Sequence, residues 1–131
     1  MKRFDHVAIA VSDLNEAIML YRDVFSFSYM GTEFVSEQQV RVAFFELGDF
    51  RLELLEATSE ESPIARFIKK RGEGIHHLAF KTDELALEVS ELKKAGVHFI
   101  GNGITKGAGG SKVQFVHPNA TFGTLIELCE G

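Results

Sequence analysis

The chain contains an internal repeat, and this repeat limits what it can fold into more than any other feature of the sequence. The segment FDHVAIAV (4–11) is repeated in similar form as IHHLAFKT (75–82), with His6 and His77 at matching positions 71 residues apart. Three further pairs share this offset: Leu14 and Leu85, Val42 and Val113, and Phe44 and Phe115. Such a repeat predicts two similar modules in which matching residues hold matching places.

Each copy ends in a second matching segment that carries an acidic residue. RLELLE (51–56) closes the first copy and LIELCE (125–130) the second, so that Glu53 matches Glu127. Their offset is 74 because the second half gains three residues before its last strand. Each module therefore supplies one histidine and one glutamate. A matched set of this kind indicates a metal site built across a pseudo-twofold axis.

Alternation of apolar and polar residues predicts four strands in each half. They lie near 3–11, 27–36, 39–47 and 50–57 in the first half, and near 75–82, 97–101, 111–117 and 124–130 in the second. A helix follows the first strand of each half. One begins after Ser12 or Asp13, with Leu14, Ala17, Ile18 and Val24 on its apolar face, and the other spans 83–95 and ends at Gly96.

This order predicts an α+β fold of two paired βαβββ modules. We expect residues 1–131 to form a single domain, with modules 1–58 and 75–131 joined by a helical linker at 59–74. Within the linker, Ser62 and Pro63 are typical of a helix start, and Gly72 of a helix end.

Composition narrows the class of protein and its surroundings. The 131 residues are 45% hydrophobic and 25% charged, which is ordinary for a soluble globular domain. A net charge of −5 argues against a nucleic-acid partner. No apolar run has membrane-spanning length, and no signal-peptide core is present. Cys129 is the only cysteine and cannot form an internal disulfide, so we expect a cytoplasmic protein.

Strand periodicity places the four matched residues where a metal ion would offset the cost of burying their polar side chains. His6 shares a strand face with Ala8, and His77 with Ala79, so that small neighbours leave room for an ion and a ligand. Glu53 and Glu127 lie between apolar residues, where an unpaired carboxylate is costly. Two imidazoles and two carboxylates favour one divalent transition metal (Zn, Ni, Co, Mn or Fe) over Ca or Mg, and no organic cofactor is indicated.

Several longer motifs resemble those of one enzyme family. They are DHVAIAV (5–11), EQQVRVAFFELGD (37–49), SPIARFIKKRGEGIHHLAF (62–80), GAGGSKVQFVHPN (107–119) and LIEL (125–128). Together they resemble methylmalonyl-CoA epimerases of the vicinal oxygen chelate (glyoxalase/bleomycin resistance/dioxygenase) superfamily. The resemblance implies a cupped mixed sheet around a metal, an acyl-CoA substrate and a homodimer. It also implies metal ligands at His6, His77 and Glu127, with Glu53, where relatives can have glutamine, as the fourth.

The implied reaction inverts the carbon alpha to a thioester, which requires a base on either side of a planar enolate. Some epimerases carry a glutamate in the third strand as a proposed base, but this chain has Val42 there. We therefore expect Glu127 to be one base, and Glu53 or a water-linked group to be the other. Substrate binding is expected at a further set of residues: Gln38, Gly109, Gly110, Ser111 and Lys112.

Two other functions remain open from the sequence. Lactoylglutathione lyase (glyoxalase I) has a His, Glu, His, Glu ligand set, which Glu53 would complete. Against it, the chain has Ala10 where glyoxalases typically have arginine, and Ala57 where they tend to have asparagine. A non-catalytic small-molecule-binding protein of the same fold is the second alternative, although such a protein has no need of the four ligands.

Overall fold

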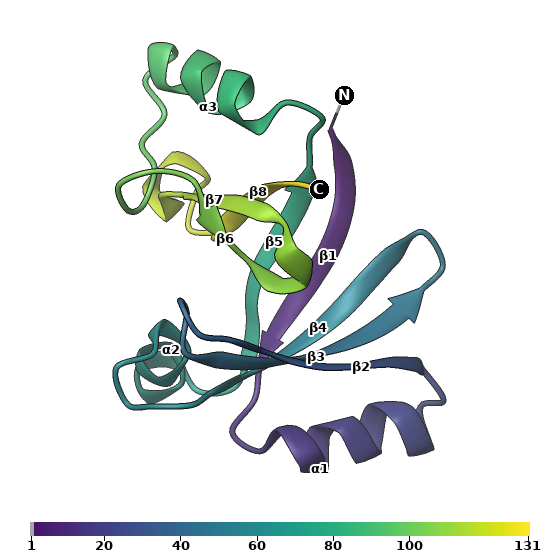
Figure 1. The fold of residues 1–131 in the computed structure, drawn as a ribbon. Helices are drawn as coiled ribbons and strands as arrows, with labels where there is room; N and C mark the ends of the chain where they lie inside the picture. The colour runs from purple at the N-terminus through teal and green to yellow at the C-terminus, as the bar shows by residue number, and fades with distance from the viewer. Residues whose placement is uncertain (1) are drawn as a thin grey trace. The chain divides into compact units, whose positions relative to one another are not determined.

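The computed structural model describes residues 2–131 (Figure 1). The chain divides into two compact units. The first unit is His6–His76, and the second unit contains His77–Gly131 together with the residues up to Asp5. The division falls within two strands, β1 (Arg3–Ala10) and β5 (Gly74–Lys81).

The first unit contains a four-strand arrangement in the order β2-β3-β4-β1. Its strands after β1 are β2 (Ser28–Val35), β3 (Val40–Leu47) and β4 (Phe50–Ala57). β3 is antiparallel to both β2 and β4, whereas β1 is parallel to β4. Since the helix α1 (Leu14–Met19) follows β1, this unit has the predicted βαβββ order.

α1 packs its apolar face on the strands of the first unit (Figure 1). Asp13 caps the helix, as predicted, because its side chain accepts a hydrogen bond of 3.1 Å from the Glu16 backbone N–H. Leu14 and Ile18 are buried against Phe45. The prediction for Val24 was wrong, since this side chain is 69% exposed. The helix widens into a π-helical segment, Leu20–Val24, and the wider turn rotates Val24 off the apolar face.

The second unit repeats the arrangement in the order β5-β8-β7-β6. Its further elements are α3 (Leu85–Lys94), β6 (Thr105–Lys106), β7 (Lys112–Val116) and β8 (Ile126–Glu130). β8 is parallel to β5 and antiparallel to β7. Leu85 and Val89 of α3 pack with Val116 and Leu128 in a small core.

The strand predicted at 97–101 was wrong. That stretch makes a single bridge, between Phe99 and Val116, and the outermost strand of the second unit is Thr105–Lys106. Gly101 and Gly103 explain the difference, because they adopt φ values of 83° and 152°, which interrupt an extended chain.

The linker forms the helix α2 (Pro63–Arg71), as predicted. The Ser62 hydroxyl accepts a hydrogen bond of 3.2 Å from the Ile64 N–H at its start, and Gly72 ends it with a φ of 83°. That the whole chain forms one domain stays a prediction.

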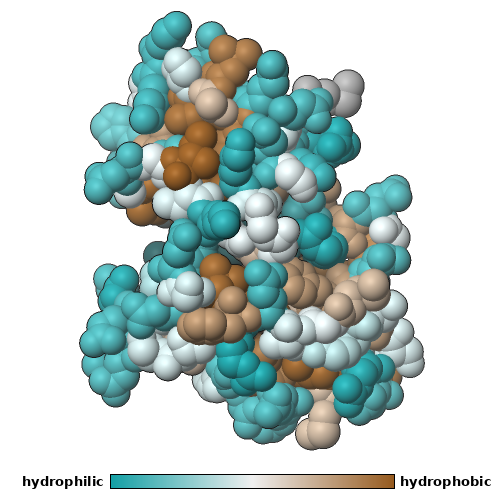
Figure 2. Space-filling model, in the orientation of Figure 1, coloured by the Kyte–Doolittle hydropathy of each residue, from teal (hydrophilic) through white to brown (hydrophobic). Residues whose placement is uncertain are grey.

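None of the helices in residues 2–131 combines the length and apolar character of a membrane-spanning segment. Hydrophilic residues occupy much of the surface drawn in Figure 2, with apolar residues between them. Exposed apolar side chains include Phe34 on β2, at 57% exposure, and Phe122, at 100%.

Candidate metal centre

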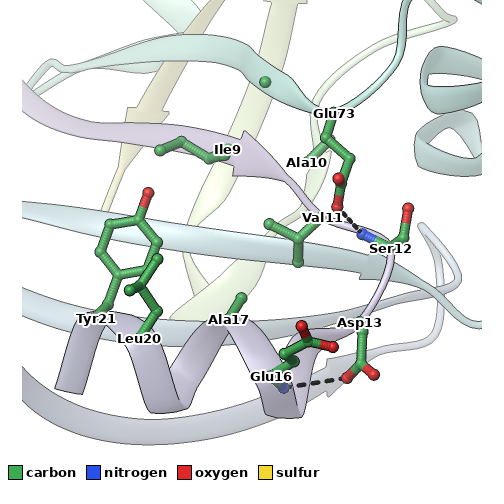
Figure 3. A pocket seen from close by; sticks show the side chains of 11 residues that line it. Ile9, Ala10, Val11, Ser12, Asp13, Glu16, Ala17, Leu20, Tyr21 and Glu73 are labelled. Atoms are coloured by element: carbon green, nitrogen blue, oxygen red, sulfur yellow. Dashed lines mark hydrogen bonds between the residues drawn. The ribbon is translucent and has the colours of Figure 1, made fainter. Parts of the chain in front are cut away.

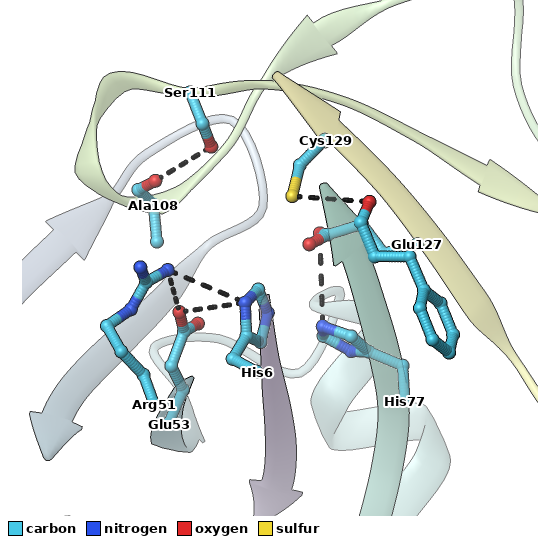
Figure 4. A network of polar contacts seen from close by, with 9 residues as sticks. His6, Arg51, Glu53, His77, Ala108, Ser111, Glu127 and Cys129 are labelled. Carbon is cyan, nitrogen blue, oxygen red and sulfur yellow. Dashed lines mark hydrogen bonds and ion pairs between the residues drawn. The ribbon is translucent and has the colours of Figure 1, made fainter. Parts of the chain in front are cut away.

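The first unit buries one histidine beside one glutamate. His6 lies on β1 and Glu53 on the adjacent parallel strand β4, where Glu53 is opposite Ala8. The Nδ1 atom of His6 is 3.3 Å from Oε2 of Glu53, and the two residues are 5% and 2% exposed. The two side chains point toward each other (Figure 4). The predicted pair of the first module is thus formed.

Arg51 joins this pair, and sequence reasoning missed it. Its Nη2 donates a hydrogen bond of 3.0 Å to Oε2 of Glu53 and lies 3.5 Å from Nδ1 of His6 (Figure 4). Alternation along β4 could have revealed it, because a residue two positions before Glu53 shares its face of the strand. The guanidinium compensates a carboxylate that burial would otherwise make costly.

The second unit buries the matching pair. The Nε2 atom of His77, on β5, is 3.8 Å from Oε2 of Glu127, on β8, and both residues are 5% exposed. The Phe115 ring meets the His77 ring edge-on, with centroids 5.2 Å apart and an interplanar angle of 86°. The Sγ atom of the buried Cys129 lies 3.6 Å from the carbonyl oxygen of Phe80, so this cysteine is a packed side chain.

These two pairs are a distinctive donor set. Among residues 2–131, the buried histidines and acidic residues are His6, Glu53, His77 and Glu127, the four that the repeat predicts. His6, His77 and Glu127 are donors of the kinds that could hold a metal ion. Buried imidazole and carboxylate donors fit a divalent transition metal, which would compensate their desolvation.

The predicted substrate residues occupy two turns, one in each unit. In the second unit, Gly109 and Gly110 have φ values of 71° and 75° in a short 3₁₀ turn, Ala108–Gly110. Ser111 closes this turn by donating from Oγ to the Ala108 carbonyl oxygen at 3.0 Å, and Lys112 begins β7. In the first unit, the carbonyl oxygen of Gln38 accepts a hydrogen bond of 3.1 Å from Oγ of Ser62.

A separate groove of about 620 Å³ lies between β1 and α1 in the first unit (Figure 3). Its acidic side chains are Asp13, Glu16 and Glu73. Glu73 accepts a hydrogen bond of 2.7 Å from the Ser12 N–H, and Asp13 caps α1. The predicted site residues do not line this groove, and two of its acids hold the start of the helix. The buried His–Glu pairs therefore remain the candidate centre.

Comparison with known proteins agrees with this fold. The model of the Glyoxalase/Bleomycin resistance protein/Dioxygenase superfamily matches residues 5–115. The chain is 39% identical to the uncharacterized protein YqjC of Bacillus subtilis (strain 168), over 99% of this chain and 93% of that one. It is 38% identical to the ethylmalonyl-CoA/methylmalonyl-CoA epimerase of Cereibacter sphaeroides, over 96% of each.

A solved structure gives the same result. The structure of a methylmalonyl-CoA epimerase in complex with methylmalonyl-CoA and NH4+ superimposes with a TM-score of 0.94 at 34% identity, covering 100% of this chain and 95% of that one. The predicted vicinal oxygen chelate fold is confirmed. Within that superfamily, the chain belongs to the methylmalonyl-CoA epimerase family.

Proposed function

We propose that this protein is a metal-dependent epimerase that interconverts (R)- and (S)-methylmalonyl-CoA. The observation that carries the proposal is the duplicated His–Glu pair, buried in each module at the same strand register. The family relationship supports the reaction and the acyl-CoA substrate. The proposed working form is a cytoplasmic homodimer.

We place one divalent transition metal (Co, Ni, Zn, Mn or Fe) on His6, Glu53, His77 and Glu127. This assignment joins donors of both units, so it includes the proposal that modules 1–58 and 75–131 pack as one domain with the linker 59–74 between them. When bound, the metal would act as a Lewis acid and stabilise negative charge that develops on the thioester oxygen.

The proton is moved by carboxylates of this chain. In the proposal, Glu127 removes the proton from the carbon alpha to the thioester on one side of the substrate. Glu53, or a group linked to it by water, returns a proton on the other side. Val42 cannot take part, since it is an apolar residue, 1% exposed, opposite Leu55 in the pairing of β3 with β4.

The proposed substrate contacts use backbone donors and one cation. The turn at Gly109 and Gly110 presents N–H groups to the free carboxylate of the substrate, and Ser111, whose N–H and hydroxyl both donate to the Ala108 carbonyl oxygen, holds this turn in place. Lys112, which is exposed, meets a CoA phosphate, and Gln38 donates from its side-chain amide.

The test is proton–deuterium exchange of methylmalonyl-CoA in D2O, followed by NMR with protein supplemented with Co²⁺. We expect exchange at the alpha carbon in the wild type and its loss in Glu127→Gln. Glu46→Gln is the matched control, because Glu46 is an exposed glutamate on β3.

The methylglyoxal–glutathione hemithioacetal is assayed beside methylmalonyl-CoA. Turnover of the hemithioacetal alone would establish the glyoxalase I function instead. A protein that retains no transition metal after supplementation and exchanges neither substrate would be a binding protein of the same fold.

A further inference from the structure

We propose that Arg51 sets the charge of the metal centre by offsetting the carboxylate of Glu53. This inference rests on the proposed function, in that it takes His6 and Glu53 to be metal ligands. It assigns to Arg51 an electrostatic role that acts through Glu53: the guanidinium offsets the charge of the Glu53 carboxylate and keeps the loaded centre positively charged for an anionic acyl group.

The contacts of Arg51 tie it to both ligands of the first unit. Its Nη2 atom is 3.0 Å from Oε2 of Glu53 and 3.5 Å from Nδ1 of His6. The same Oε2 atom is 3.3 Å from Nδ1 of His6. One carboxylate oxygen is therefore shared between a guanidinium and an imidazole. The Glu53 side chain is 3% exposed and that of Arg51 is 40%, so Arg51 reaches a buried anion from the solvent side.

The strand register explains why Arg51 can hold both residues. Arg51 is the direct partner of His6 in the parallel pairing of β1 with β4, and it lies two residues before Glu53 on the same strand. Its side chain thus shares the strand face of Glu53 beside the His6 backbone. This placement is fixed by the sheet and does not depend on a mobile loop.

The second module carries no such charge at the matching position. Leu125 corresponds to Arg51 by the offset that relates Glu53 to Glu127. The backbone bears this out, because the Leu78 N–H donates to the Leu125 carbonyl oxygen at 3.2 Å, next to His77. The repeat therefore duplicates the donors but places a guanidinium on one of them only.

This asymmetry matters for the charge of the loaded centre. The ionised carboxylates of Glu53 and Glu127 would cancel the charge of one divalent cation and leave a neutral centre. The substrate, however, carries its own carboxylate and gains further negative charge as an enolate. A guanidinium in contact with Glu53 makes the same centre net positive, which attracts such an anion. The same positive charge of Arg51 must also oppose binding of the metal cation, and this effect can be measured as a lower affinity for the metal.

The test is a double-mutant cycle on metal affinity, which requires no substrate. The apparent Kd for Co²⁺ is measured by competition with a chromophoric chelator for the wild type, Arg51→Gln, Glu53→Gln and the double variant. We expect Arg51→Gln to tighten Co²⁺ binding on the order of tenfold when Glu53 is present. In the Glu53→Gln background the same change should alter the Kd less than about twofold, because the Arg51 side chain, which is 40% exposed, then lacks the carboxylate that holds its guanidinium beside the centre. Arg51→Lys, which keeps the charge, should stay near the wild type.

A second readout uses the charge of the acyl group. With the metal loaded, Arg51→Gln should weaken the binding of malonyl-CoA and leave that of propionyl-CoA, which has no free carboxylate, nearly unchanged. A change that only loosened the fold would weaken both ligands.

Three results would overturn the role of Arg51. The first is that Arg51→Gln changes the Kd for Co²⁺ equally in the wild type and in Glu53→Gln. The others are weaker metal binding in Arg51→Gln, and an Arg51→Lys variant that binds the metal as Arg51→Gln does. Failure of the wild type to bind any transition metal would overturn the proposed function as well. Metal binding with additive effects in the cycle would overturn only the inference about Arg51.

Discussion

Phe115 lies opposite Glu127 in the antiparallel pairing of β7 with β8, and its ring also meets the ring of His77 edge-on. The first module has the same register, with Phe44 opposite Glu53. One aromatic residue therefore neighbours both members of the His77–Glu127 pair. The Phe115 ring limits how the imidazole of His77 can turn, and an imidazole that is already oriented loses less freedom when it binds a metal.

Replacing Phe115 by alanine is expected to weaken metal binding about tenfold, because His77 loses the ring that orients it. It should also lower the free energy of unfolding by about 1–3 kcal/mol, since the ring is only half-buried. Isothermal titration with Co²⁺ and urea unfolding measure the two effects. Phe34→Ala on β2 is the control, because that ring is 57% exposed. Unchanged affinity in Phe115→Ala would mean that His77 needs no such support.

The four predicted donors were found because a repeat can be seen in the linear sequence. His6, His77, Glu53 and Glu127 stand at matching positions, and strand alternation is enough to bury them. Arg51 was missed because its importance depends on which residue of β1 lies opposite it, and a single sequence does not state the register between strands. Strand alternation places Arg51 on the same face of β4 as Glu53, but it does not show that His6 of β1 lies opposite Arg51.

Two errors in the fold have local causes. The π-helical segment Leu20–Val24 continues an apolar pattern of α-helical spacing, so periodicity alone could not show that Val24 turns outward. The stretch 97–101 has the apolar alternation of a strand, but the glycines at its end take the chain into positive φ. In both places backbone geometry overrode a side-chain pattern.

Removing His77, one of the proposed metal ligands, should remove the stabilisation that the metal gives. At a free metal concentration one hundred times the Kd, binding adds about 2.7 kcal/mol to the free energy of unfolding, which is a rise of roughly 8–10 °C in Tm for a chain of this size. We expect this rise in the wild type on adding Co²⁺, its reversal by EDTA, and its absence in His77→Asn. His98→Asn, at an exposed histidine, is the matched control. An undiminished rise in His77→Asn would exclude His77 as a ligand.

Gln39 is a position where glycine should be tolerated better than alanine. It adopts a φ of 50°, and its carbonyl oxygen accepts a hydrogen bond of 2.9 Å from the Thr58 N–H. Its side chain also accepts a hydrogen bond from the Ser59 hydroxyl. Alanine loses the side-chain bond and keeps the strain, whereas glycine relieves the strain. Gln39→Gly should therefore be more stable than Gln39→Ala by about 1 kcal/mol in chemical unfolding.

The same two substitutions at Glu91 provide the control. Glu91 lies within α3 and is exposed, so alanine should be the more stable variant there by about 1 kcal/mol. The opposite order at the two positions would show that the φ of Gln39 is responsible. Equal stability of Gln39→Gly and Gln39→Ala would show that the turn relaxes without strain.

His76 should make the metal-free protein less stable in acid. Partial burial, and then repulsion by Arg71, lower the pKa of His76 from 6.5 to about 4, and its ring packs edge-on against Phe67 with centroids 4.9 Å apart. The unfolded chain therefore binds this proton more readily than the folded one. The contribution is fully present above pH 6.5 and is lost progressively as the pH falls through about 4, to a total of roughly 3 kcal/mol.

We expect His76→Gln to flatten this pH dependence. The free energy of unfolding of the variant and of the wild type is measured at pH 7 and at pH 4 with a chelator present, and the variant should lose less stability between the two. Arg71→Gln should flatten it partly, because only the smaller cause of the shift is removed. His98→Gln is the matched control for the loss of an exposed histidine. The contrary outcome is that His76→Gln and the wild type lose the same amount of stability between these pH values. His76 would then bind its proton as readily in the folded chain as in the unfolded one. Its packing against Phe67 would impose no cost on the charged ring.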